Sequence, residues 1–207
     1  MSSSGRRRSR QRFTGQIAGV GSTSGVRVVV GHWVDSPLGT FTDVMLADRD
    51  GQRLLLAPDD RVADFVSATY GFDSVVIGPV LAAVDRERWQ VQAPGLDLQL
   101  EVGSRAAVGN LLRLVPRRLA TAPGWTRVTD PVARRVLRGV RTRGTAGGGR
   151  REYYGATDLH RILSLRGSWR GLDLGGLAPV SPEPGFGFGS TPQRPAVTSI
   201  VTTIDLV

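Results

Sequence analysis

Alternating apolar and polar residues run through much of the chain and predict β-strands. In Leu96–Val102 every second residue is apolar, which is typical of a strand with one face in a core and the other in water. Val26–Trp33 and Phe41–Ala47 are rich in β-branched and aromatic residues and predict two strands joined by a loop at Asp35–Gly39. The same signals predict further strands at Gln52–Ala57, Ser74–Val84, Trp89–Ala93, Glu152–Ala156 and Val197–Leu206.

Helical periodicity is confined to three segments. Asp59 or Asp60 is expected to cap a short helix that Gly71 closes. Ala106–Val115 predicts a second helix. A third is expected from Asp130-Pro131 to Arg141, because an N-cap residue precedes proline and apolar residues recur opposite a row of arginines.

These elements predict a single domain of the mainly β (α+β) class. A length of 207 residues with 40% hydrophobic residues is enough for one core. Residues 1–12 carry five arginines and no acid, so they are expected to form a disordered basic tail. The domain then covers residues 13–207, with an arginine-rich helical insertion at about 105–145.

Composition removes several classes of chemistry. The chain has no Cys and no Lys, which excludes disulfides, thiolate zinc sites, cysteine nucleophiles and imine-forming lysines. The two histidines, His32 and His160, are too few for a three-histidine metal site. No cofactor and no metal is therefore predicted. Abundant Arg, Ala and Gly without Lys is typical of a high-GC bacterial genome.

The net charge of +9 is unevenly distributed. Residues 105–166 hold fourteen arginines against three acids, whereas residues 13–104 hold six arginines against twelve acids. This arginine band is either the solvated face of the helical insertion or a surface for nucleic acid or an anionic membrane. No apolar run approaches the roughly 18 residues of a membrane span, and we expect a cytoplasmic protein.

Asp43 and His32 are the candidate catalytic residues. Asp43 lies in an apolar strand with Phe41 and Met45 on its own face, so it is either solvent-facing or a pocket carboxylate with a raised pKa. If the loop at Asp35–Thr40 closes symmetrically, His32 lies directly opposite Asp43 and the two form an acid–base pair. A slip of one residue would place them on opposite faces, and packing in the core is the alternative role for His32.

Several other residues are candidates for the lining of a ligand pocket. Tyr153 and Tyr154 should point to opposite faces of a strand, so that one phenol lies inside. Arg151 follows a glycine-rich segment, Gly147–Gly149, which is either an anion-binding loop or a flexible connection. His160 could orient on Asp158, or lie alone on the surface. No chemistry is assigned to the loop Phe186–Gly189. The pocket candidates are Phe41, Met45, Tyr153, Tyr154, Trp169 and Arg151.

Two short motifs, in this order of elements, carry a resemblance to a known family. The first is Leu38-Gly39-Thr40-Phe41-Thr42-Asp43, and the second is Ser168-Trp169-Arg170-Gly171 followed by Leu172 and Leu174. Together they resemble the acetoacetate decarboxylase-like superfamily over residues 26–100 and 150–207. The resemblance implies a cone-shaped β-barrel with a few flanking helices, a small and partly apolar cavity, and a homo-oligomer.

The resemblance does not extend to the family's catalytic lysine. The positions that match this lysine are Ala68 and Thr69, so the imine chemistry of the decarboxylases is lost. Asp43 matches one of the family's two acidic pocket residues, and the other falls in the apolar stretch Val28–Val30.

Three functions remain open at this point. The leading one is the binding of a small, partly apolar and possibly acidic organic molecule in a barrel cavity, without imine catalysis. The second is a lysine-independent acid–base enzyme that uses Asp43 and His32. The third is an interaction protein whose arginine band binds nucleic acid or an anionic membrane.

Overall fold

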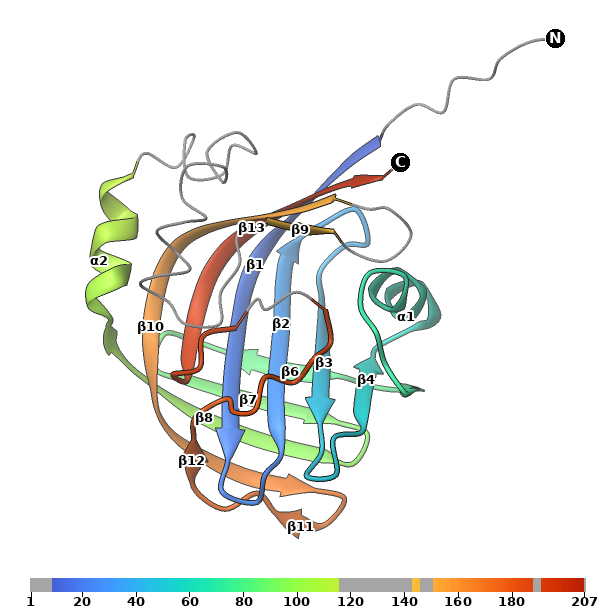
Figure 1. Cartoon of the computed structure of the whole chain (residues 1–207), viewed down its shortest axis with the longest axis vertical. Coiled ribbons are helices and arrows are strands. Elements are labelled where there is room, and N and C mark those ends of the chain that lie inside the picture. Colours follow the sequence, from blue (N-terminus) through green and yellow to red (C-terminus); the bar gives the residue numbers. More distant parts are fainter. Residues whose placement is uncertain (1–8, 116–142, 146–150, 188–190, 207) are drawn as a thin grey trace, which may run out of the picture.

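The computed structural model describes residues 9–115, 143–145, 151–187 and 191–206 (Figure 1). These residues form one strongly curled antiparallel sheet with a single parallel pair, β4 and β5. Its main path runs β5-β4-β3-β2-β1-β13-β10-β8-β7-β6, with β9, β11 and β12 paired at its sides. The strands are β1 Ser9–Ser22, β2 Arg27–Asp35, β3 Phe41–Ala47, β4 Arg53–Ala57, β5 Ser74–Ile77, β6 Leu81–Val84, β7 Arg88–Ala93, β8 Leu96–Arg105, β9 Arg143–Thr145, β10 Arg151–Trp169, β11 Leu172–Asp173, β12 Leu177–Ala178 and β13 Ala196–Leu206.

The curled sheet forms a half-barrel. In Figure 1, strands β1–β4 stand upright, and β6–β8 cross behind them. The two edge strands, β5 and β6, are joined by residues 78–80 alone. A link of this length holds the ends of the two edge strands within roughly 14 Å of each other. The predicted mainly β fold with a barrel-like sheet and few helices is confirmed.

The sheet carries one apolar cluster on each face. The inner cluster lies inside the curl, where Val28 and Leu46 of β2 and β3 meet Trp89 and Leu98 of β7 and β8. The outer cluster lies on the other face of β1–β4 and includes Val29, which alternates with Val28. All seven residues of β3 are buried, because helix α1 covers the face that points away from the inner cluster.

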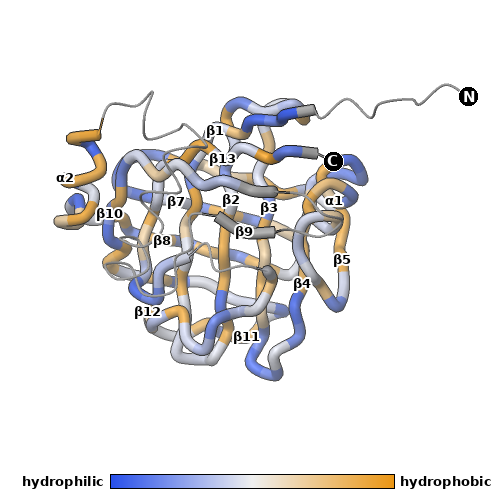
Figure 2. The backbone as a smooth tube through the Cα atoms, turned by 45° about the horizontal axis from the view of Figure 1, so that its top comes forward, coloured by the Kyte–Doolittle hydropathy of each residue, from blue (hydrophilic) through white to orange (hydrophobic). Residues whose placement is uncertain are grey.

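Helices α1 (Asp60–Ser67) and α2 (Ala107–Leu114) are both at predicted positions. Asp59 caps α1 by accepting a hydrogen bond from the Val62 amide at 2.9 Å. The last helical residue is Ser67 and Ala68 is the C-cap, so the expected closure at Gly71 is three residues late. Helix α2 lies beside β10, and much of its ribbon has the apolar colour in Figure 2. The predicted third helix, 130–141, lies outside the described residues.

A segment that we call the strap, residues 177–187, crosses the outer face of β1–β4 (Figure 1). It begins as β12, which pairs with β1, and Pro179 lies directly against Gly21, where no side chain could fit. Farther along, the Gly185 carbonyl accepts a hydrogen bond from Arg53, and Phe186 joins the outer cluster. The strap and α1 together explain why the outer face is buried.

The predicted boundaries need three corrections. Residues 9–12 are not a disordered tail, because they pair with β13 and Arg10 forms an ion pair with Asp205. Segment 74–84 is two strands at opposite edges of the sheet, since Gly78-Pro79 interrupts the pattern and proline has no amide hydrogen to donate. The insertion is shorter than 105–145, because Arg105 ends β8 and 143–145 form β9. Residues 1–8 and 116–142 lie outside the described part.

Among the described residues, no helix is long and apolar enough to cross a membrane.

Candidate functional site

The register of β2 and β3 separates the two candidate catalytic residues. Asp43 lies opposite Gly31, and His32 lies opposite Thr42. Paired residues share a face and neighbours along a strand alternate, so His32 and Asp43 point to opposite sides of the sheet. The prediction that they form an acid–base pair is therefore wrong, because the register of β2 and β3 differs by one residue from the expected one.

Asp43 is a buried carboxyl group on the outer face. Its side chain accepts a hydrogen bond from the Trp33 indole at 2.9 Å, and the residue is only 3% exposed. Gly31 makes room for this contact, because a Cβ there would lie 2.6 Å from an Asp43 carboxylate oxygen. Burial raises the pKa of Asp43 to about 7, although the hydrogen bond from Trp33 opposes the shift.

His32 lies on the inner face of the sheet. Its Nδ1 is 2.9 Å from the Thr42 hydroxyl, and its ring packs edge-on against Trp89. Partial burial lowers the pKa of His32 below its ordinary value, because removal from water disfavours the imidazolium. These contacts fit the packing role that was the alternative for this histidine.

The predicted pocket residues do not converge on one site. Phe41, Met45 and Tyr154 belong to the outer cluster, where the Tyr154 hydroxyl contacts that of Tyr70. Tyr153 precedes Tyr154 on β10 and points to the other face, as expected, and both residues are buried. Arg151 begins β10, but its side chain lies outside the description, as do residues 146–150 of the glycine-rich segment.

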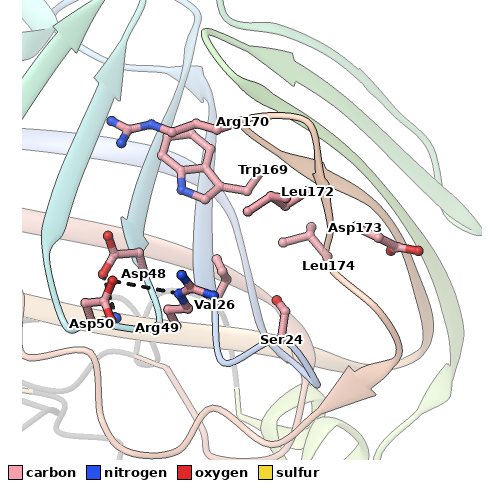
Figure 3. Close-up of a pocket in the computed structure, with 10 residues that line it drawn as sticks. All are labelled: Ser24, Val26, Asp48, Arg49, Asp50, Trp169, Arg170, Leu172, Asp173 and Leu174. Atoms are coloured by element: carbon pink, nitrogen blue, oxygen red, sulfur yellow. Dashed lines mark hydrogen bonds and ion pairs between the residues drawn. The ribbon is translucent and has the colours of Figure 1, made fainter.

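Trp169, another of the pocket candidates, lines a cleft. The cleft has a volume of about 410 Å³ and lies at one end of the half-barrel, where three turns meet. These are the β1–β2 turn, the β3–β4 turn and the β10–β11 turn (Figure 3). Three members of the inner cluster, Val26, Trp169 and Leu174, form part of its wall, so the cleft borders the packed core. Its full lining is Ser24, Val26, Asp48, Arg49, Asp50, Trp169, Arg170, Leu172, Asp173 and Leu174.

Each acidic side chain of the cleft has a partner in its own turn. An Asp48 carboxylate oxygen accepts hydrogen bonds from the amides of residues 50 and 52, and Asp173 accepts one from the amide of residue 175. Asp50 lies 3.8 Å from Arg49, with both side chains largely exposed. These carboxylates therefore hold the turns, and Arg49 is partly neutralised.

Arg170 differs from the other charged residues of the cleft. Its guanidinium lies 4.9 Å from the centre of the Trp169 ring, and Figure 3 places it beside the indole. Among the described residues, no carboxylate lies within ion-pair distance of it. Its backbone is also unusual, because Arg170 has a φ of 50° and is the only described residue other than glycine with a positive φ.

A buried arginine, Arg27, binds the backbone of the β3–β4 turn. Arg27 is 8% exposed, and its Nη2 donates a hydrogen bond to the Asp48 carbonyl at 2.8 Å. The same carbonyl accepts the Gly51 amide, which closes the turn. Arg27 therefore fixes the segment that carries three lining residues of the cleft, 48–50.

The predicted contact of His160 with Asp158 is present at 3.6 Å, at the junction of β8 and β10. Arg105 binds the same carboxylate through two hydrogen bonds of 2.7 and 3.0 Å. These contacts lower the pKa of Asp158, against the effect of its partial burial. Because Asp158 already holds Arg105, this group is an ion-pair cluster rather than a poised catalytic dyad. No group of three or more His, Asp or Glu side chains suited to a metal occurs in the described part of the chain.

Comparison with known proteins gives no relative. No family model, no curated protein and no solved structure matches this chain.

Proposed function

We propose that the protein binds a small, partly apolar organic molecule in the cleft at the end of the half-barrel. The observation that carries the proposal is that three residues of the inner cluster, Val26, Trp169 and Leu174, form part of the wall of this cleft. A ligand seated there would cover apolar surface that the turns leave open. The volume of the cleft, about 410 Å³, falls in the range of small-molecule sites, roughly 300–1,000 Å³.

The composition of the wall supports a ligand of mixed character. Leu172 offers an exposed apolar side chain, the buried residues Trp169 and Leu174 lie behind it, and charged side chains lie around it. Leu172 is 65% exposed, so a ligand in the cleft would cover apolar surface that now faces water. Sites for small molecules combine such apolar walls with a few polar groups that fix orientation.

The proposal extends to features that the resemblance to acetoacetate decarboxylase-like proteins implies. The ligand is bound without imine formation, because the chain has no lysine. The protein is a cytoplasmic bacterial homo-oligomer in this proposal. An acid–base reaction that uses Asp43 and His32 together is not part of it, since the two side chains lie on opposite faces. Binding of nucleic acid or an anionic membrane stays a prediction, because most of the arginine band lies outside the described residues.

Two exposed leucines provide a matched test. Leu172 lines the cleft at the start of β11 and is 65% exposed, whereas Leu163 lies on β10, is not part of the cleft and is 62% exposed. A panel of small aromatic and aliphatic acids, amides and alcohols is titrated into the protein by calorimetry. We expect at least one compound to bind, and Leu172→Asn to weaken its binding about tenfold while Leu163→Asn leaves it unchanged.

Two results would contradict the proposed binding site. If no compound of the panel binds at millimolar concentration, or if both leucine variants bind as well as the unaltered protein, the cleft is not the binding site. Thermal unfolding of both variants checks that the fold is intact. Since both side chains are largely in water, neither substitution should change stability by more than about 0.5 kcal/mol.

A further inference from the structure

The charge of the ligand can be inferred from Arg170. This inference rests on the proposed function, because it concerns the same cleft. Arg170 and Gly171 form the two-residue turn between β10 and β11, and both have positive φ angles, 50° and 77°. A turn of this kind favours Asn, Asp or Gly at both positions. An arginine there costs conformational energy because its Cβ crowds the backbone at positive φ.

Among the described residues, no acidic side chain binds Arg170 and so explains why an arginine occupies this turn position. Its amide donates a hydrogen bond to the Gly95 carbonyl at 2.6 Å, a contact that any residue at this position can make. Its guanidinium stacks on Trp169, and no carboxylate of the described residues is within ion-pair distance. The planar group is thus held beside the cleft with its charge uncompensated.

The acids of the cleft do not supply that compensation. Asp48 and Asp173 hold backbone amides of their own turns, and Asp50 faces Arg49. Of the two arginines that line the cleft, Arg49 faces Asp50, so Arg170 is the one whose charge is available to an anionic ligand. We propose that Arg170 selects a ligand with a planar apolar part and a carboxylate, the ring packing on the wall at Leu172 and the carboxylate bound by the guanidinium.

Guanidinium groups suit this task for two reasons. Their donors form a planar fork that matches a carboxylate, and stacking on an aromatic ring restricts the fork to one plane. Arg170 is therefore a specificity-determining residue, whereas the apolar wall provides affinity for neutral and charged ligands alike.

The test compares a carboxylate with its neutral analogue. Phenylacetate and phenylacetamide have nearly the same size and shape and differ in charge, and each is titrated by calorimetry at low salt. The variant is Arg170→Gly, which removes the guanidinium and relieves the positive φ, so the fold should be kept or stabilised. Arg166→Gln is the control, because Arg166 is an exposed arginine near the end of β10 that does not line the cleft.

We expect the unaltered protein and Arg166→Gln to bind phenylacetate about tenfold more tightly than phenylacetamide. In Arg170→Gly the two affinities should become equal, through weaker binding of phenylacetate alone. Equal affinities in the unaltered protein, or a preference that persists in Arg170→Gly, would overturn the inference and leave the proposed function standing. If neither probe binds at millimolar concentration, the inference is overturned, and the candidate ligands of the proposed function no longer include aromatic compounds of this kind.

Discussion

At the scale of single residues, Asp43 is the most informative position. A carboxyl group 3% exposed has little water around it, and the Trp33 indole is its side-chain hydrogen-bond donor. Water stabilises a carboxylate far better than one indole does, so the neutral acid is favoured in the folded state. The pKa of Asp43 is raised from 3.8 to about 7 as a result. Unfolding returns the group to water and to its ordinary pKa.

This difference gives a pH-dependent stability with a definite sign. The folded protein holds a proton on Asp43 that the unfolded chain releases, so the contribution of Asp43 is most favourable below pH 4. It is lost as the pH rises from about 4 to about 7. In urea unfolding, the free energy of unfolding of the unaltered protein should fall relative to Asp43→Asn across this window, by up to about 4 kcal/mol.

Asp64→Asn is the control, because Asp64 lies on the exposed side of α1. The difference in the free energy of unfolding between the unaltered protein and Asp64→Asn should show no comparable change between pH 4 and pH 7. A constant difference between the unaltered protein and Asp43→Asn over the same range would mean that Asp43 is solvated in solution.

At the scale of elements, the sequence predicts strands better than their pairing. Phe41–Ala47 and Leu96–Val102 were identifiable because β-branched residues or strict alternation dominate them. Only the start of β10 was predicted, since the polar residues around Asp158 coincide with a bulge that interrupts the alternation. The tail was misread because residues 9–12 are polar, yet their backbone pairs with β13.

The register of β2 and β3 depends on a loop that local rules do not determine. Gly39 adopts a φ of 87°, and its amide closes a turn on the Ser36 carbonyl. The Thr40 hydroxyl then reaches the Val34 carbonyl at 3.0 Å. These bonds fix Trp33 opposite Phe41, which is one residue away from the register that pairs His32 with Asp43. Because side chains alternate at every residue, this small difference separates the two completely.

The start of β1 provides a test at this scale. Deleting residues 1–12 should lower the free energy of unfolding by about 2 kcal/mol more than deleting residues 1–8, because residues 9–12 lose their ladder to β13. Ile204 is 3% exposed and pairs with Gln11, so the longer deletion exposes more of this side chain than the shorter one does. Thermal and urea unfolding of the two truncated chains measure the difference. Equal stabilities would show that residues 9–12 do not pair in solution.

At the scale of the whole molecule, the cleft is formed by parts of the chain that are distant in sequence. Ser24 and Val26, the turn at residues 48–50, and the hairpin around Trp169 are brought together only when the sheet curls. The sequence alone indicated Trp169, as part of a motif, but it gave no reason to join it to the other two turns. Long-range closure of this kind depends on the curvature of the sheet, which no local pattern encodes.

The curl also explains why the cleft is at the end of the half-barrel rather than inside it. Large side chains such as Trp89, Leu98 and Leu100 fill the interior between the two layers and are at most 1% exposed. The packing ends near the β10–β11 turn, where Trp169 closes the inner cluster and faces the cleft. The molecule therefore has a packed centre and an open end, and the open end is where a ligand can bind.

The most direct test of this account follows the tryptophan indoles during a titration with phenylacetate. Their N–H signals in a ¹H–¹⁵N correlation spectrum are assigned with Trp→Phe variants. Trp33 and Trp89 serve as internal controls, because Trp33 binds Asp43 on the outer face and Trp89 lies in the interior, away from the cleft. Binding in the cleft should shift the Trp169 signal in proportion to saturation, while those of Trp33 and Trp89 stay in place. A Trp169 signal that does not move, or shifts confined to Trp33 or Trp89, would contradict it.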